Sequence, residues 1–142
     1  MTETTDEIIG RALRIATKAH KGQVEWSGTP FILHPIRVYN RVDDSTPGVD
    51  AKVVALLHDV IEDTDVTLEV LKGEFGPGRI IDAIDAITRR EGETYMEYIV
   101  RLSVDRLARI VKLADLDDHL ETLPHDHSLR GRYERAISAL KR

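Results

Sequence analysis

The chain has 142 residues, a length that fits one ordinary domain and allows a hydrophobic core without disulfides. It contains no cysteine, which excludes a disulfide framework, a thiolate metal site and a cysteine nucleophile. Its net charge is -5 with the signs mixed along the sequence, whereas a general nucleic-acid binder needs a basic face. The N-terminus is polar and acidic, and no apolar run reaches membrane-spanning length, so we expect a cytoplasmic protein that binds neither nucleic acid nor membrane.

Hydrophobic residues recur at helical spacing along almost the whole chain, and no segment reads convincingly as a strand. Thr-x-x-Glu matches at Thr4 and Thr94 fit the capping box that begins many helices. Turn residues gather at 21–30 and 43–48, where we expect loops. The sequence therefore predicts one all-α domain over residues 1–142, a bundle of about seven or eight helices. The expected helices begin near Thr4, Pro35, Asp50, Thr67, Pro77, Thr94, Ser103 and Ser128.

The helix expected to begin at Asp50 is apolar on nearly its whole circumference and reaches His58 and Asp59 at its end. A helix of this kind is buried on most sides. Buried imidazole and carboxylate groups are normally paired, hydrogen-bonded or bound to a metal, because their desolvation is costly. Glu62 and Asp63 follow one turn later on the same faces. This helix is therefore predicted to offer two ligands and two further carboxylates together.

Two other ionisable residues lie in apolar settings, His34 at the end of an apolar run and Asp115 within a buried helix. Taken alone, His34 would fit a buried histidine bonded to backbone, and Asp115 could pair with Lys112 one turn earlier. With His58 and Asp59 they make a set of two imidazoles and two carboxylates from three helices. Such a mixed nitrogen and oxygen set suits Mn²⁺, Fe²⁺ or Zn²⁺.

Glu62 and Asp63 could be ordinary solvent-facing carboxylates, but two negative charges at the end of a helix oppose its dipole. Functional sites tolerate such unfavourable local placement. Next to a cation, one carboxylate can take a proton from water while the other orients that water or protonates the leaving oxygen. We therefore predict that both residues are catalytic.

The run Ala-Leu-Leu-His-Asp-Val-Ile-Glu-Asp-Thr at 55–64 resembles the signature of the HD-domain metal-dependent phosphohydrolases. In particular it is similar to the hydrolase domain of RelA/SpoT-type alarmone enzymes and their small single-domain relatives. Other matching blocks follow the same order, namely Ala-His-Lys-Gly-Gln at 19–23, a segment ending in His-Pro at 28–35, Ile-Thr-Arg-Arg at 87–90 and Val-Lys-Leu-Ala-Asp at 111–115.

The resemblance implies an HD-domain helical bundle and a manganese-dependent hydrolase of a phosphorylated nucleotide. In this family Glu62 and Asp63 would activate water for the release of pyrophosphate from the ribose 3′ position. The chain has no room for the synthetase region of the larger enzymes, so we expect hydrolysis only. The positions that match the metal ligands of the family are His34, His58, Asp59 and Asp115.

Seven residues are candidate substrate contacts. The lysines and arginines are candidates for binding phosphate. For each of them except Lys112, which lies one turn before Asp115, a solvated basic side chain is an equally good interpretation. The serine and threonine match positions of the family, and the histidine stands where the family has an asparagine near the ribose. The set is Lys21, Ser27, Arg89, Arg90, Lys112, His119 and Thr122.

The chain departs from the family pattern in two places. Glu25 and Trp26 stand where the family usually has an Arg-Lys pair. In the family, the guanidinium of that arginine packs against the base of the nucleotide. Leu-Asp-Asp-His at 116–119 replaces Arg-Leu-His-Asn. Glu25 would bring negative charge near an anionic ligand, so we expect altered base and ribose recognition with the chemistry retained.

Two alternatives remain beside an alarmone hydrolase. The first is a phosphohydrolase of another nucleotide or small phosphoester. The second is a non-catalytic HD module that binds a nucleotide or a metal, against which the intact Glu62 and Asp63 speak. The oligomeric state does not follow from the sequence.

Overall fold

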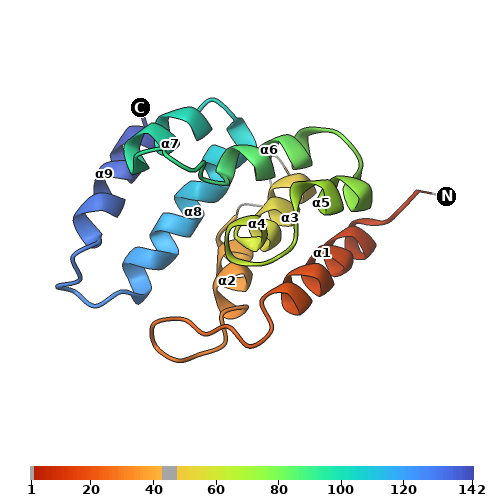
Figure 1. Ribbon diagram of the computed structural model, residues 1–142, viewed down its shortest axis with the longest axis horizontal. Helices are drawn as coiled ribbons and strands as arrows, with labels where there is room; N and C mark the ends of the chain where they lie inside the picture. Colours follow the sequence, from red (N-terminus) through yellow and green to blue (C-terminus); the bar gives the residue numbers. More distant parts are fainter. Residues whose placement is uncertain (1, 43–47) are drawn as a thin grey trace.

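The computed structural model describes residues 2–42 and 48–142, and within these it contains helices and no strand (Figure 1). Backbone pairing outside the helices amounts there to one isolated bridge between Val24 and Pro30. The all-α prediction is confirmed; α4 is a single turn, and the other eight helices agree with the expected number. The helices are α1 (Thr5–Ala19), α2 (Leu33–Arg41), α3 (Val49–Leu57), α4 (Val60–Asp63), α5 (Leu68–Phe75), α6 (Arg79–Ile87), α7 (Tyr95–Leu102), α8 (Arg106–Thr122) and α9 (Arg130–Leu140).

Three of the predicted N-caps are present. The hydroxyls of Thr4, Thr67 and Thr94 each accept a hydrogen bond from the backbone N–H three residues later. The side chain of Glu97 in turn accepts a hydrogen bond from the backbone N–H of Thr94, which completes the capping box. These local signals fix where α1, α5 and α7 begin. The expected loop at 43–48 lies outside the described residues except for Gly48.

Three other predicted N-caps are wrong. Asp50 lies inside the first turn of α3 and forms an ion pair with Arg79 of α6 instead of capping. Ser103 ends α7, and the cap of α8 is Asp105, whose carboxylate accepts the Ala108 N–H at 2.9 Å. The last helix begins at Arg130, beyond Ser128, with no side-chain cap.

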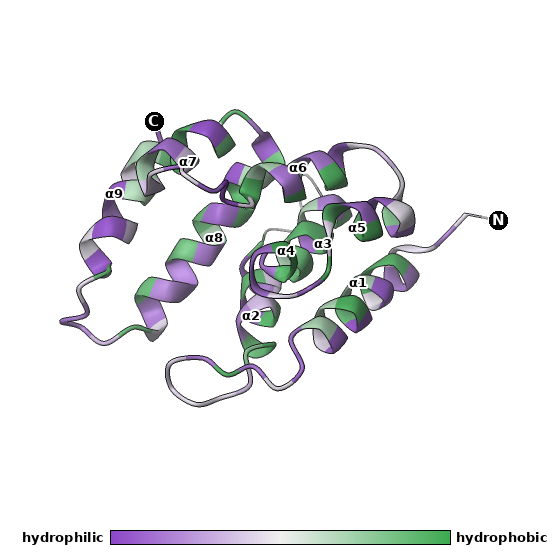
Figure 2. Cartoon of the chain, viewed as in Figure 1, coloured by the Kyte–Doolittle hydropathy of each residue, from purple (hydrophilic) through white to green (hydrophobic). Residues whose placement is uncertain are grey.

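Helix α3 is the centre of the bundle and packs against α1, α2, α6 and α8. Its residues 51–57 are all buried, which agrees with the apolar circumference read from the sequence. In Figure 2 hydrophobic bands lie on α3 and the helices around it, while α8 and α9 carry more hydrophilic bands. No helix in the described part of the chain has the length and hydropathy needed to cross a bilayer. At the end of α3, His58 is held in the interior and is 2% exposed.

Helix α7 offers a direct test of this packing. Ile99 is completely buried, whereas the adjacent Val100 is 59% exposed. Ile99→Ala should lower the free energy of unfolding by about 2–5 kcal/mol, because it leaves a cavity in the core. Val100→Ala should change it by no more than about 0.5 kcal/mol, as is usual for a surface position. Urea unfolding followed by circular dichroism measures both, and similar losses in the two variants would contradict the orientation of α7.

Candidate metal centre

His34 is the second residue of α2, and its side chain lies in the interior. Pro35 stands in the first turn of this helix, where its missing N–H has no intrahelical partner to lose. His34 is only 1% exposed. Its Nε2 lies 2.8 Å from Oδ1 of Asp115 and 3.5 Å from Oδ2 of Asp59.

The His-Asp pair lies at a break between two helices. Helix α3 ends at Leu57, His58 and Asp59 follow, and α4 begins at Val60. Nδ1 of His58 donates to the carbonyl of Ala55 at 2.6 Å, which leaves Nε2 facing the other ligands. This nitrogen lies 3.0 Å from Oδ2 of Asp59.

Asp115 supplies the second carboxylate from the middle of α8 and is 2% exposed. Lys112, one turn earlier, donates to Oδ2 at 2.9 Å. Oδ1 lies 3.2 Å from Nε2 of His58 and 3.2 Å from Nε2 of His119. Burial alone would raise the pKa of Asp115, but the positive charges of Lys112, His119 and His58 hold it well below its usual range. Its oxygens are therefore available as anionic ligands.

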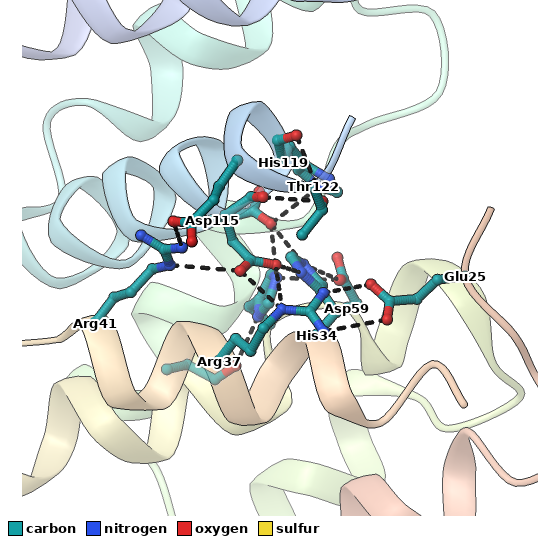
Figure 3. Close-up of polar contacts among 12 residues, drawn as sticks. Glu25, His34, Arg37, Arg41, Asp59, Asp115, His119 and Thr122 are labelled. Carbon is teal, nitrogen blue, oxygen red and sulfur yellow. Dashed lines mark hydrogen bonds and ion pairs between the residues drawn. The ribbon is translucent and has the colours of Figure 1, made fainter. Parts of the chain in front are cut away.

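The four predicted ligands come together as one cluster (Figure 3). Each of His34, His58, Asp59 and Asp115 offers one ligand atom, and these atoms lie within 4.8 Å of one another. Burial opposes protonation of His34, but hydrogen bonds with Asp115 and Asp118 outweigh it and raise the pKa of this imidazole to about 9. The carboxylates around this imidazole therefore stabilise its charged form. Two imidazoles and two carboxylates within reach of one point fit a divalent transition metal.

Glu62 and Asp63 lie on the single turn α4, directly after this cluster. Oε1 of Glu62 accepts the backbone N–H of Arg89 at 2.6 Å, which fixes this carboxylate on the α6–α7 connection. Burial raises the pKa of Glu62, with Asp59 contributing. Burial and the charges of Asp59 and Glu62 raise the pKa of Asp63 to about 6. Both residues reach the surface, and these shifts make each carboxyl group take up a proton more readily than an ordinary carboxyl group, which suits a general acid or base.

A polar cavity of about 220 Å³ opens beside the cluster. Two arginines and a lysine on its walls offer positive charge to an anion, and three carboxylates, a histidine and three tyrosine rings form the rest of the wall. Arg132 lies 4.9 Å over the ring of Tyr95, which holds its guanidinium at the rim. The lining residues are Asp59, Glu62, Arg89, Tyr95, Tyr98, Lys112, Asp115, His119, Arg132 and Tyr133.

Three of the seven candidate substrate contacts line this cavity, namely Arg89, Lys112 and His119. The ring of His119 stacks on that of His34, with centroids 4.6 Å apart. Lys112 has a second role as the partner of Asp115.

The other four candidates are placed elsewhere. Lys21 lines a separate exposed hollow at the end of α1. The guanidinium of Arg90 donates to backbone carbonyls at the end of α6, and the hydroxyl of Thr122 donates to the carbonyl of Asp118. Ser27 is exposed, and its hydroxyl lies 2.9 Å from that of Thr29.

Sequence reasoning missed several residues that support the site. Nδ1 of His20 donates to the side chain of Gln23 at 2.8 Å, and this amide donates to the carbonyl of Asp63 at 2.8 Å. Asp118 is fully buried beside His34, 2.7 Å from its Nδ1. Arg132, which lines the cavity, was not among the candidate residues either. A signal existed only for Asp118, since an aspartate one turn after Asp115 continues the buried face of α8.

The metal ligands can be tested directly. His58→Ala removes one of the two ligand imidazoles, so we expect the protein to lose Mn²⁺ that the wild type retains after loading and gel filtration. His125→Ala is the matched control, because His125 is exposed in the α8–α9 loop. Elemental analysis of the three proteins measures bound metal. Equal manganese in wild type and His58→Ala would rule out this ligand set.

The chain was compared with known proteins. No protein-family model matches it. It is 35% identical over 124 residues to a probable GTP pyrophosphokinase of Mycobacterium leprae, covering 82% of the chain and 16% of that protein. It is 38% identical over 119 residues to the guanosine-3′,5′-bis(diphosphate) 3′-pyrophosphohydrolase of Haemophilus influenzae, covering 77% of the chain and 18% of that protein. The chain thus spans less than a fifth of the length of these relatives.

A solved structure has the same fold. It is described as a metazoan ortholog of SpoT that hydrolyzes ppGpp and plays a role in starvation responses. The TM-score is 0.75 at 24% identity, and the match covers 100% of this chain and 88% of the other. Sequence and fold therefore agree: the chain is similar in sequence to part of RelA/SpoT-type enzymes and has the helical fold of a SpoT ortholog.

Proposed function

We propose that the chain is a manganese-dependent phosphohydrolase that removes pyrophosphate from the 3′ position of guanosine 3′,5′-bis(diphosphate). The observation that carries this proposal is the position of Glu62 and Asp63 on the single turn that directly follows two of the four clustered ligands, with Glu62 also lining the cavity that holds Arg89, Lys112 and Arg132. The names of relatives such as that of Haemophilus influenzae suggest the nucleotide. The metal ligands and carboxylates suggest hydrolysis.

His34, His58, Asp59 and Asp115 would hold the cation. Their mixed nitrogen and oxygen atoms fit Mn²⁺, and the family resemblance favours this ion over Fe²⁺ and Zn²⁺. A bound Mn²⁺ would supply Lewis acidity towards a phosphoryl oxygen and make nearby water more acidic.

Glu62 and Asp63 then handle the protons of the reaction. One carboxylate takes a proton from the attacking water, whose oxygen forms a bond with phosphorus. The bond between phosphorus and the 3′ oxygen breaks, and a proton returns to that oxygen. Asp63, with its pKa raised to about 6, can accept the proton, and Glu62 is held by the Arg89 N–H so that it orients the water.

The cavity offers positive charge to the diphosphate. Arg89, Lys112 and Arg132 line it in a protein whose net charge is -5, so anion binding depends on this local arrangement. Its volume of about 220 Å³ is below the roughly 300–1,000 Å³ common for whole drug-sized ligands. We therefore expect it to receive the diphosphate end of the nucleotide.

The proposal predicts hydrolysis of guanosine 3′,5′-bis(diphosphate) to GDP and pyrophosphate by the Mn²⁺-loaded protein. Ion-exchange chromatography of the products, over a panel that includes non-guanine nucleotides, measures activity and selectivity. Glu62→Gln and Asp63→Asn should each reduce turnover by about two to four orders of magnitude, the usual range for a lost acid or base, and should retain the metal. The matched control is Asp65→Asn, two residues beyond α4.

Two results would count against the proposal. If no nucleotide of the panel is hydrolysed, the chain is no phosphohydrolase of this class. If Glu62→Gln and Asp63→Asn both keep the wild-type rate, the roles assigned to α4 are wrong even where hydrolysis occurs.

The raised pKa of Asp63 also predicts a pH dependence. A general base must be ionised, so turnover should fall as the pH drops below about 6, where Asp63 takes up a proton. A bound cation favours the ionised form, so the midpoint should lie at this value or below it. The pH profile of kcat at saturating Mn²⁺ measures the midpoint. Activity that rises on acidification through this range would show that Asp63 does not act as the base.

A further inference from the structure

A line of charged side chains joins the 21–30 loop to the metal ligand His34 (Figure 3). Glu25 forms an ion pair with Arg37 of α2, and its second oxygen lies 3.2 Å from Nη1 of the same guanidinium. Nε of Arg37 donates to Asp118 at 2.9 Å, and the carboxylate of Asp118 lies 2.7 Å from Nδ1 of His34. Three elements of the fold thus meet at one guanidinium.

The last contact decides how His34 faces the cluster. The Asp118 side chain is 0% exposed and forms an ion pair with Arg37, whose Nε lies 2.9 Å from Oδ1 and 3.1 Å from Oδ2 of the carboxylate. An ionised carboxylate can only accept, so Nδ1 of His34 must carry a proton and donate it. Nε2 is thereby left to face Asp59 and Asp115, which is the orientation that metal ligation needs.

Glu25 acts on this arrangement through Arg37. Its side chain is 10% exposed and also accepts from the Thr29 hydroxyl at 3.0 Å, so it is fixed on the loop. The guanidinium of Arg37 is 32% exposed and would otherwise be free to turn towards solvent. With Glu25 on one side and Asp118 on the other, Arg37 has one favourable position.

A second cation at this place is excluded by the same guanidinium. Glu25, His34 and Asp118 each offer a ligand atom within 4.8 Å of the others, which by itself would permit a metal. Arg37 already binds both carboxylates, and Nδ1 of His34 carries the proton that Asp118 accepts. The cluster is therefore a support of the first metal centre.

The two carboxylates of this support are also the two departures noted in the sequence. Glu25 stands where the family pattern has an arginine, and Asp118 stands where it has a histidine. The expectation that Glu25 presents a negative charge to the substrate is not met, because Arg37 neutralises it. Glu25 and Asp118 therefore belong to the same group of charged side chains, because both form ion pairs with Arg37.

We infer that Glu25 is a positioning residue of the metal centre, which holds Arg37 against Asp118 and so fixes His34 for ligation, and that it takes no part in substrate recognition. The inference rests on the metal centre of the proposed function. It assigns Glu25 to the cation rather than to the base of the nucleotide.

Mn²⁺ titration of the purified chain, with the free ion measured by electron paramagnetic resonance, tests the inference. The carboxylate of Asp118 faces three donors, His34, Arg37 and, at 3.4 Å, Arg41. In Asp118→Asn the amide oxygen can still accept but the amide nitrogen donates, so at least one of these donors loses its acceptor. Loss of such a supporting hydrogen bond lowers metal affinity about 10–100-fold, and we expect this range for Asp118→Asn and about threefold to tenfold for the more distant Glu25→Gln. The matched control is Asp117→Asn, an exposed neighbour on α8 that should bind Mn²⁺ as the wild type does.

A second measurement needs no metal. The proton on Nδ1 of His34 should give a slowly exchanging signal in the proton NMR spectrum, because Asp118 holds it in the interior. It should exchange faster in Glu25→Gln and in Asp118→Asn, and thermal unfolding of the same samples shows that the variants are folded. At saturating Mn²⁺ the KM of Glu25→Gln for guanosine 3′,5′-bis(diphosphate) should not move.

The outcomes separate this inference from the proposed function. If Glu25→Gln raises KM while Mn²⁺ affinity and proton exchange stay as in the wild type, Glu25 acts on the substrate and the inference is wrong. If the wild type binds no Mn²⁺, the proposed metal centre fails, and the exchange rates alone decide whether Glu25 positions His34. If Mn²⁺ binds but no nucleotide is hydrolysed, only the substrate assignment is lost.

Discussion

The carboxylate of Asp115 is the constraint on which the rest of the structure depends. It is buried in the middle of α8 and would be costly there without donors. Lys112 supplies one donor from the same helix, while His34 and His58 reach it from α2 and from the end of α3. These contacts require three helices to be held in register, and the packing of α3 against α2 and α8 provides that register. The apolar core and the polar centre are therefore parts of one arrangement.

Much of the fold followed from local signals. The helical periodicity predicted the bundle, and threonines at Thr4, Thr67 and Thr94 marked three helix starts correctly. Local signals failed where a nearby residue offered a better bond. Asp105 lies closer to the start of α8 than Ser103, and Asp50 is drawn to Arg79. Sequence spacing alone does not contain these competing partners, because they lie in other helices or depend on where the preceding helix stops.

The site, like the fold, was predictable where the signal is local to a segment of the sequence. His34, His58, Asp59 and Asp115 stood out because ionisable residues in apolar runs need partners, and all four meet in space. Asp118 left a signal because it continues the buried face of α8, but its contact with His34, 84 residues away, was not predictable. Residue type alone did not distinguish the basic residues that line the cavity, such as Arg89, from those that lie on the surface or bind the end of a helix, such as Lys21 and Arg90. That distinction required the orientation of each side chain.

The hydrogen bonds of His34 have a consequence for how the centre fills. Both ring nitrogens have carboxylate neighbours, Asp118 on one side and Asp115 on the other, and the pKa of about 9 means that the ring carries two protons at neutral pH. A cation can bind Nε2 only when the proton on Nε2 leaves. Metal binding therefore releases a proton, so affinity for the cation weakens on acidification. The centre would thus respond to the acidity of its surroundings as well as to the supply of metal.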